Sequence, residues 1–414
     1  MRTPQAGARP APDIPAATAA VLLDNPVRPY AWGSATAIPD LLGVPPTGEP
    51  QAELWLGAHP AAPSRLRSGG TLAELVEADP LGELSAPVVE RFGPRLPFLM
   101  KVLAAERPLS LQAHPDRDRA RDGYAAQERR GIPKDAPERT YVDANHKPEL
   151  VCALTPFDGL CGFRAVPETL RLLDLLAGPA PALAPYADAL RARPDQRGLR
   201  EVVGAILTGP AAARPELVAS VAVACAELGA GPYRLERETV TELAQAYPDD
   251  AGVVITLLLN RVRLAPGEAM FLGAGNLHCY LRGTAVEVLA SSDNVLRGGL
   301  TTKHVDAPEL LRVLDVAAGP PPLLAPVPAG RGVLGYVPPV PDFRLDRITL
   351  GPQGSSLTTG GPQIVLTLSG SAVLDGALPL PRGASAWVSA GRPVSAASSA
   401  SEDAVLARAT TNLS

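Results

Sequence analysis

A stretch of helical periodicity set between strand-rich stretches constrains the fold most. Residues 166–248 repeatedly place Leu, Val and Ala at three- and four-residue spacing, which is typical of helices that bury one face. Residues 21–160 instead consist of short apolar segments separated by turn residues, and a second strand-rich stretch begins near residue 261. This order predicts a mainly β protein with α structure, in which the helices form a separate block.

The end of the chain predicts a further β unit beyond a proline-rich linker at residues 319–328. This unit contains no His and no Cys, so we expect a structural or lid role for it and look for chemistry elsewhere. Its short strands are expected at close intervals, as in a sandwich or barrel, at residues 343–350, 363–368, 371–374, 385–388 and 404–407.

The composition of the 414 residues excludes several classes of protein. Hydrophobic residues make up 46% of the chain, enough for sizeable cores, yet no apolar run reaches the roughly 18 residues of a membrane span. The formal net charge is −5 and the basic residues are scattered. Neither nucleic acid nor a membrane is therefore an expected partner.

The cysteines and residues 1–20 indicate the cellular compartment of the protein. The four cysteines form no C-x-x-C pair, which argues against a disulfide framework or a zinc ribbon and favours reduced thiols. Residues 1–20 are rich in Pro and Ala and lack a compact apolar segment, so we expect a flexible tail and no signal peptide. The sequence predicts a cytoplasmic protein.

Lysine and histidine are rare and gather in a few places. Only four of the 38 basic residues are lysines, and the chain has five histidines. We expect chemistry in the segments that hold three of the lysines and all the histidines, which are residues 51–60, 101–116, 141–150 and 276–304.

Two of these segments place polar side chains on one face of a strand. Ser110, Gln112 and His114 alternate along the chain and therefore point the same way. Lys147 and Glu149 also share a face if the chain is extended, as a residue before proline favours. Each strand then offers metal ligands beside a group that can bind an anion.

A third segment, residues 273–288, adds a histidine and a carboxylate. We interpret Arg282-Gly283 as a two-residue hairpin turn. The resulting register sets His278 directly opposite Glu287, with roughly 5 Å between their Cβ atoms. The sequence thus predicts that these two side chains face each other across a hairpin.

Together the three segments supply a ligand set suited to Zn²⁺. The set contains two neutral imidazoles, a carboxylate and an amide oxygen, with water completing the shell. A neutral amide is a poor donor to Zn²⁺, so Gln112 is the weakest member on physical grounds. The candidate ligands are Gln112, His114, Glu149 and His278.

At these residues the sequence resembles the type I mannose-6-phosphate isomerases (phosphomannose isomerases), zinc enzymes of the cupin superfamily. The resemblance extends from about residue 25 to 315. Its most specific stretches are LSLQAHPD at residues 109–116, NHKPE at 145–149 and SDNVLRGGLTTK at 292–303.

The resemblance implies a fold of two cupin-like β-sandwich or jelly-roll units with an inserted all-helical domain. The expected catalytic cupin domain combines residues 21–160 with 250–318, and the helical domain covers residues 161–249. Residues 329–414 are expected to form the C-terminal cupin-like β domain.

The resemblance also implies an activity and roles for residues. The activity is the reversible conversion of mannose 6-phosphate to fructose 6-phosphate through a cis-enediol(ate), with one Zn²⁺ per chain. The expected partner is therefore a small sugar phosphate, and we expect a monomer. The implied metal ligands are Gln112, His114, Glu149 and His278, and the implied catalytic arginine is Arg297.

Proton transfer and phosphate binding complete the expected site. We favour Glu287 as the proton shuttle, with zinc-bound water or a histidine as the rival. Phosphate requires compact positive charge and hydrogen-bond donors, which Lys147 and Ser110 are expected to supply. Lys101 and Lys303 are weaker candidates for contacts with the substrate.

Two other classes of function compete with the isomerase. A cupin metal oxygenase uses a similar set of two histidines and a carboxylate, although a lysine and a serine beside the ligands favour a phosphorylated substrate. A sugar-phosphate sensor would bind without isomerising, which the presence of Arg297 and Glu287 disfavours. A nucleotidyltransferase is set aside because the chain has neither a P-loop nor a G-x-G-x-x-G motif.

Overall fold

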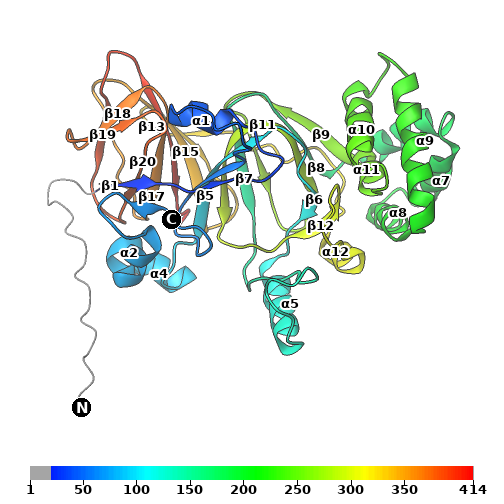
Figure 1. Cartoon of the computed structure of the whole chain (residues 1–414), viewed down its shortest axis with the longest axis horizontal. Helices are drawn as coiled ribbons and strands as arrows, with labels where there is room; N and C mark the ends of the chain where they lie inside the picture. The colour runs from blue at the N-terminus through cyan, green and yellow to red at the C-terminus, as the bar shows by residue number, and fades with distance from the viewer. Residues whose placement is uncertain (1–19, 414) are drawn as a thin grey trace.

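The computed structural model describes residues 20–413, and the flexible tail predicted for residues 1–20 lies outside the described residues except for Ala20. The chain forms a mixed α/β structure with three sheets, in which neighbouring strands are antiparallel, and a helical region at one end (Figure 1). This arrangement confirms the predicted combination of strand-rich stretches with a separate helical region.

The central sheet has ten strands and holds most of the polar residues singled out above. Its main path follows the order β10-β7-β11-β5-β3-β2, and β6, β8, β9 and β12 extend it from β11. The strands are β2 (Val27–Arg28), β3 (Glu53–Leu56), β5 (Phe98–Ala105), β6 (Leu111–Ala113), β7 (Glu149–Ala153), β8 (Phe157–Phe163), β9 (Leu259–Leu264), β10 (Ala269–Leu272), β11 (His278–Ala290) and β12 (Leu296–Gly299).

The second large sheet has eight strands in the order β13-β14-β15-β22-β17-β20-β1-β4. Its strand β1 comes from the start of the described chain yet pairs with β20 and β4, so the first β-rich stretch contributes two strands to this sheet. The strands are β1 (Ala20–Asp24), β4 (Arg65–Leu66), β13 (Val327–Gly330), β14 (Val333–Tyr336), β15 (Arg344–Leu350), β17 (Gln363–Ser369), β20 (Ser385–Val388) and β22 (Ala404–Thr410).

A four-stranded sheet in the order β16-β21-β18-β19 packs with the eight-stranded one. Its strands are β16 (Ser355–Ser356), β18 (Ser371–Leu374), β19 (Leu378–Pro381) and β21 (Ser395–Ser398). Together these two sheets enclose an apolar core of their own, which includes Ile348, Val365 and Leu406.

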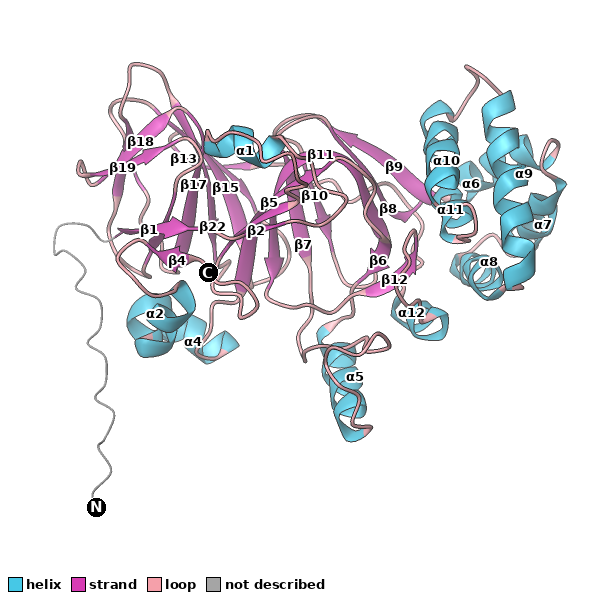
Figure 2. Ribbon diagram, in the orientation of Figure 1, coloured by secondary structure: helices cyan, strands magenta, loops and turns pink. Residues whose placement is uncertain are grey.

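The helices between residues 166 and 255 gather at the end of the molecule beyond β8 and β9, while α5 and α12 lie at one edge and α2 and α4 lie below the opposite end (Figure 2). The helices are α1 (Ala37–Leu42), α2 (Leu72–Ala78), α3 (Pro80–Leu84), α4 (Ala86–Phe92), α5 (Arg117–Arg129), α6 (Val166–Ala177), α7 (Ala184–Ala192), α8 (Gln196–Thr208), α9 (Arg214–Glu227), α10 (Arg234–Ala246), α11 (Gly252–Ile255) and α12 (Ala307–Val313), with 3₁₀ turns at Pro181–Leu183, Ala211–Ala213 and Thr256–Leu258.

Apolar packing joins these parts and fixes the central sheet between them. The helical block shares a core with β6, β8 and β12, in which Leu111 and Leu296 are buried against helix residues such as Leu199. Another part of the central sheet, which includes β3, β5 and β7, shares a core with the eight-stranded sheet, where Val286 and Trp387 are fully or nearly fully buried. The strands that carry the candidate site are therefore packed against one or the other of these two cores, and β11 contributes to both.

Candidate metal centre and cavity

The candidate site residues surround a cavity of about 630 Å³ in the central sheet. Seven of the nine residues proposed from the sequence line it, which are Ser110, Gln112, Lys147, Glu149, Glu287, Arg297 and Lys303. The other two, His114 and His278, each place Nε2 3.3 Å from a carboxylate oxygen of Glu149. The structure thus brings all nine residues to one place, although they are up to 193 residues apart in sequence.

Strand β11 carries two of these residues, His278 and Glu287, in an arrangement that differs from the sequence-based prediction. The hairpin predicted at Arg282-Gly283 is wrong, because β11 continues from His278 through Glu287 as one strand. Its first part pairs with β6 and β8, where His278 is opposite Gln112, and its second part pairs with β5 and β7.

Gly283 explains why a turn signal occurs inside this strand. Its φ is +120°, and a Cβ there would lie 2.6 Å from the carbonyl oxygen of Pro156. The pairing register also shifts between Tyr280 and Arg282. Gly283 therefore allows two backbone segments to approach closely beside a β-bulge, which is a common role of glycine within strands.

Two buried histidines present ring nitrogens to one carboxylate. His114 Nδ1 lies 2.7 Å from the carbonyl oxygen of Asn294, and His278 Nδ1 lies 3.0 Å from that of Asn276. Each Nδ1–H therefore donates to a carbonyl, which leaves the lone pair of Nε2 pointing toward Glu149. His114, Glu149 and His278 are each at most 2% exposed.

These atoms fit a metal ion, because their lone pairs converge without a donor between them. Both Nε2 atoms and Glu149 Oε2 are buried and make no hydrogen bond. The three residues offer ligand atoms that all lie within 4.8 Å of one another. Two imidazoles and a carboxylate in this arrangement form a site suited to Zn²⁺. Gln112, which is on β6, pairs with His278 of β11 and lines the cavity.

The electrostatics of the cluster keep its ligands in their metal-binding forms. Burial, opposed in part by the Glu149 carboxylate, lowers the pKa of His114 from 6.5 to about 4, so the ring is neutral at pH 7. Burial alone would raise the pKa of Glu149, but His114 and Lys147 outweigh it and hold this pKa well below its usual range. Lys147 Nζ is 3.2 Å from Glu149 Oε1.

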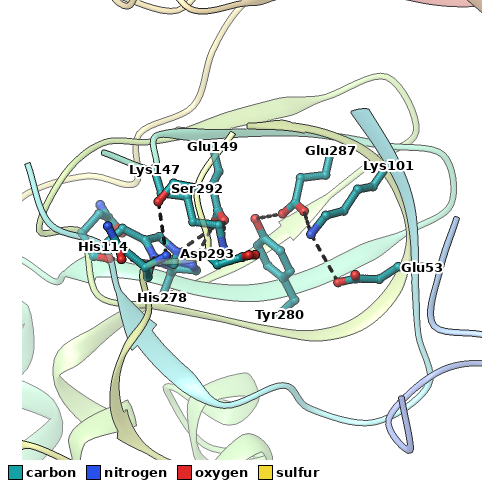
Figure 3. Close-up of polar contacts among 12 residues, drawn as sticks. Glu53, Lys101, His114, Lys147, Glu149, His278, Tyr280, Glu287, Ser292 and Asp293 are labelled. Carbon is teal, nitrogen blue, oxygen red and sulfur yellow. Dashed lines mark hydrogen bonds and ion pairs between the residues drawn. The ribbon is translucent and has the colours of Figure 1, made fainter. Parts of the chain in front are cut away.

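A second polar cluster begins beside the metal ligands and ends at Glu53 (Figure 3). The Tyr280 hydroxyl donates to Glu287 Oε1 at 2.9 Å, and Lys101 Nζ lies 3.3 Å from the other oxygen of Glu287. Lys101 is also 3.5 Å from Glu53, and Trp55 Nε1 donates to Glu53 at 2.6 Å. All five residues line the cavity.

The charges and burial of this second cluster shift the pKa values of Glu287 and Lys101. Burial raises the pKa of Glu287, and the nearby Glu149 raises it further, while Lys101 opposes the shift. The two glutamates Glu53 and Glu287 outweigh burial and hold the pKa of Lys101 above its usual value. A glutamate whose pKa lies above its ordinary range is suited to general acid–base chemistry near neutral pH.

Arg297 and Lys303 supply positive charge on another wall of the cavity. Arg297 is on β12 in register with Gln112, and neither cation forms an ion pair within residues 20–413. Burial lowers the pKa of Arg297, and burial together with the Arg297 charge lowers the pKa of Lys303. Two cations close together without acidic partners suit an anionic ligand.

Sequence reasoning missed several residues that hold the site together. Tyr280 is two residues after His278 in a strand, so the two-residue repeat places it on the same face and was a usable signal. Glu53 and Asn294 gave no such signal, because their roles depend on contacts with residues far away in sequence.

A mixed α/β protein with antiparallel sheets and a buried His–Glu–His site beside a cavity lined by charged residues fits the class of metal-dependent enzymes. Comparison with known proteins makes the class specific. Residues 21–166 match the model of the family described as "Phosphomannose isomerase type I, catalytic domain". Within residues 20–413, no helix has the length and apolar character needed to cross a bilayer.

Relatives extend this match over most of the chain. The chain is 40% identical to mannose-6-phosphate isomerase of Escherichia coli over 85% of its own length and 89% of the relative's. It is 32% identical to the Bos taurus mannose-6-phosphate isomerase over 92% of its length and 96% of the relative's. The chain belongs to the type I phosphomannose isomerase family.

Solved structures agree with the sequence relatives. A crystal structure of a variant phosphomannose isomerase from Salmonella typhimurium has a TM-score of 0.87 and 39% identity, covering 95% of this chain and all of that one. A mannose 6-phosphate isomerase bound with zinc and yttrium has a TM-score of 0.86 and 39% identity over the same shares.

Proposed function

We propose that this chain interconverts mannose 6-phosphate and fructose 6-phosphate by moving a proton between C2 and C1 through a cis-enediol(ate). The observation that carries the proposal is the His114–Glu149–His278 site, whose Glu149 lines the same cavity as Glu287. Family membership supplies the substrate, because the relatives are mannose-6-phosphate isomerases.

We assign the metal site to one Zn²⁺ per chain. His114, Glu149 and His278 would hold it, and Gln112 is the proposed fourth ligand because it is in register with His278. When bound, Zn²⁺ supplies Lewis-acid stabilisation of negative charge on a substrate oxygen. The zinc-bound structural relative supports this choice of metal.

Glu287 is the proposed proton shuttle. Its carboxylate lines the cavity, is 2% exposed and has a raised pKa. In the aldose-to-ketose direction it takes the proton from C2 of the open-chain sugar and returns it to C1. Tyr280 and Lys101 each contact one carboxylate oxygen and hold the group in place.

The proposed anion contacts divide between two parts of the substrate. Arg297 lies beside Gln112 and has no acidic partner among the described residues, so we place it at the oxygen that becomes negative in the enediolate. Lys147 and Ser110 are the proposed phosphate contacts, and the exposed Lys303 is a further one at the cavity wall.

The architecture proposed from the sequence fits this function. We keep two cupin-like units with an inserted helical domain as the proposed domain organisation, with boundaries as predicted apart from β1 and β4, which belong to the eight-stranded sheet. The proposed state is a cytoplasmic monomer. All nine candidate residues belong to one chain, and the four cysteines are free and buried, which supports both parts of this proposal.

The direct test is a coupled assay of purified, metal-analysed protein with mannose 6-phosphate, before and after chelation. We expect turnover that chelation abolishes and that Zn²⁺ restores, and chelator-insensitive turnover would contradict the metal assignment. Glu287→Gln should lower kcat by about 10²- to 10⁴-fold while the zinc content stays the same. Oxygen uptake with ferrous iron in place of isomerisation would identify an oxygenase instead.

A further inference from the structure

The C-terminal β unit contacts the loop that carries Lys147. In this contact, His146 Nε2 lies 2.9 Å from Asp342 Oδ1, and Arg117 Nη2 lies 2.7 Å from His146 Nε2 and 3.2 Å from Asp342 Oδ1. Asp342 lies two residues before the start of β15 and is 1% exposed. Up to residue 413, the C-terminal unit provides no lining residue to the cavity, and this contact connects it to the loop that carries Lys147.

The chemistry of the three groups decides how they bond. One ring nitrogen cannot donate to Asp342 and accept from Arg117 at the same time. An ionised carboxylate only accepts, so the His146 Nε2–H donates to Asp342 Oδ1, Arg117 also donates to Asp342 Oδ1, and the Arg117–His146 contact is then not a hydrogen bond. The carboxylate is then the centre of the contact, and a hydrogen bond to a buried charge of this kind is stronger than a neutral one.

Asp342 itself is held from the end of the chain. The Asn412 backbone N–H donates to the Pro341 carbonyl at 3.1 Å. The Asn412 side-chain amide donates to the carbonyl oxygens of Pro338 and Val340, each at 3.0 Å. These bonds tie the segment before β15 to the residues after β22, so Asp342 is a fixed partner for His146.

The loop that carries Lys147 is also held by hydrogen bonds at Asn145, so only a short segment lies between Asn145 and the start of β7. The Asn145 carbonyl accepts from Ser292 Oγ at 3.2 Å and from Asn294 Nδ2 at 2.8 Å. Regular pairing resumes at Glu149, the first residue of β7. Between these two residues, His146 contacts the C-terminal unit while its neighbour Lys147 lines the cavity.

We infer that Asp342 is a positioning residue that acts through His146 to hold Lys147 in its substrate-binding place. The inference rests on the proposed function, in which Lys147 contacts the phosphate. The side chains of adjacent residues in such a short segment point in different directions, so fixing His146 on one side restricts the position of Lys147 on the other. The C-terminal unit thereby contributes to substrate binding without touching the substrate.

The experiment compares steady-state kinetics of Asp342→Ala and His146→Ala with the wild type. Each change should raise the KM for mannose 6-phosphate about tenfold, the equivalent of one lost hydrogen bond to a charged group, with kcat changed less than about twofold and zinc content unchanged. The double variant should be no worse than either single one, because both remove the same contact. Asp342→Asn keeps an acceptor oxygen and should fall closer to the wild type.

A matched control removes another contact with the C-terminal sheet that does not involve the loop. Glu83 of α3 accepts from Trp387 Nε1 and from Ser389 Oγ, both at 2.6 Å. Glu83→Ala should lower thermal stability and leave the KM unchanged. If it raises the KM as much as Asp342→Ala does, general loosening explains the effect and the inference is overturned.

A second comparison separates this inference from the proposed function. Lys147→Ala should raise the KM, and adding Asp342→Ala to it should have no further effect. If Lys147→Ala raises the KM but Asp342→Ala does not, or if the two effects multiply, the positioning role is refuted while the isomerase proposal stands. If the wild-type protein does not turn over mannose 6-phosphate, the proposed function itself has failed. Should Asp342→Ala not fold, His146→Ala and Asp342→Asn decide the question.

Discussion

The hydroxyl of Tyr280 gives a direct way to test Glu287 as the proton shuttle. It donates to Glu287 Oε1 at 2.9 Å inside a fully buried cluster, while Lys101 occupies the other oxygen. Tyr280→Phe removes this one donor and keeps the ring that packs against Phe157. The change therefore alters the carboxylate's environment with little effect on packing.

The sign and size of the effect follow from the contact. A hydrogen bond donated to a carboxylate favours its ionised form, so losing the bond raises the pKa of Glu287, which burial already raises. A hydrogen bond to a charged group contributes about 1.5–3 kcal/mol, which corresponds to roughly one to two pKa units. A base must be ionised to act, so activity in the variant should be lost at a higher pH than in the wild type.

The assay is the pH profile of kcat/KM for the zinc-loaded variant and the wild type. We expect the acid limb to move up by about one unit or more and the activity to recover toward higher pH. Ionisation of the substrate phosphate is common to both profiles and cancels in the comparison. Tyr336→Phe is the control, because its buried hydroxyl donates to the Gly267 carbonyl at 2.6 Å, outside this cavity. An unshifted acid limb in Tyr280→Phe would refute the role of Glu287 or its tuning by Tyr280.

Metal removal, acid and a substitution at Gly283 test three other parts of the structure. Stripping the metal should lower the melting temperature by several degrees, with recovery on adding Zn²⁺, because the ion binds only the folded arrangement of ligands; an unchanged melting curve would contradict this. Burial lowers the pKa of His114 from 6.5 to about 4 in the folded, metal-free protein, so the unfolded chain binds a proton that the folded chain does not. The free energy of unfolding should therefore fall by roughly 3 kcal/mol as the pH drops from about 6.5 to 4. His114→Gln should flatten this denaturation profile, and equal slopes would count against the assignment. Gly283→Ala places a Cβ 2.6 Å from the Pro156 carbonyl at a φ of +120° and should cost at least about 1–3 kcal/mol in chemical denaturation, whereas Gly178→Ala, where a Cβ meets no neighbouring atom within 4 Å, should be nearly neutral.

The sequence was most informative where local periodicity determines structure. The strand expected around residues 97–103 is β5, Phe98–Ala105, and the helical spacing of residues 166–248 corresponds to the helices from α6 to α10. Motif residues were informative for a different reason, since the ligand types at alternate strand positions already restrict the chemistry. Gln112 lies in β6, and His114 directly follows the last residue of that strand, so both come from the segment that the two-residue repeat singled out.

Features that depend on distant contacts could not be predicted in this way. The pairing of β1 with β20 joins residues more than 360 positions apart, and no local pattern encodes it. The Arg-Gly signal was read as a turn because the neighbours of Gly283 in space, Pro156 and Phe157, are invisible in its local sequence. The Glu53–Lys101–Glu287 cluster likewise forms only after three separate strands have paired.

The continuity of β11 changes how the proposed chemistry is organised. A hairpin would have placed the metal ligand and the base on two strands, with their separation set by a turn. In the structure, His278, Tyr280 and Glu287 belong to one strand, which is paired with β8 in its first part and on both edges, with β5 and β7, around Glu287. The separation of metal and base is therefore fixed by the backbone of a buried strand, which is stiffer than a turn at a sheet edge. Because proton transfer requires the proposed base within about 3 Å of the reacting substrate carbon, this rigidity requires the substrate to fit a fixed site.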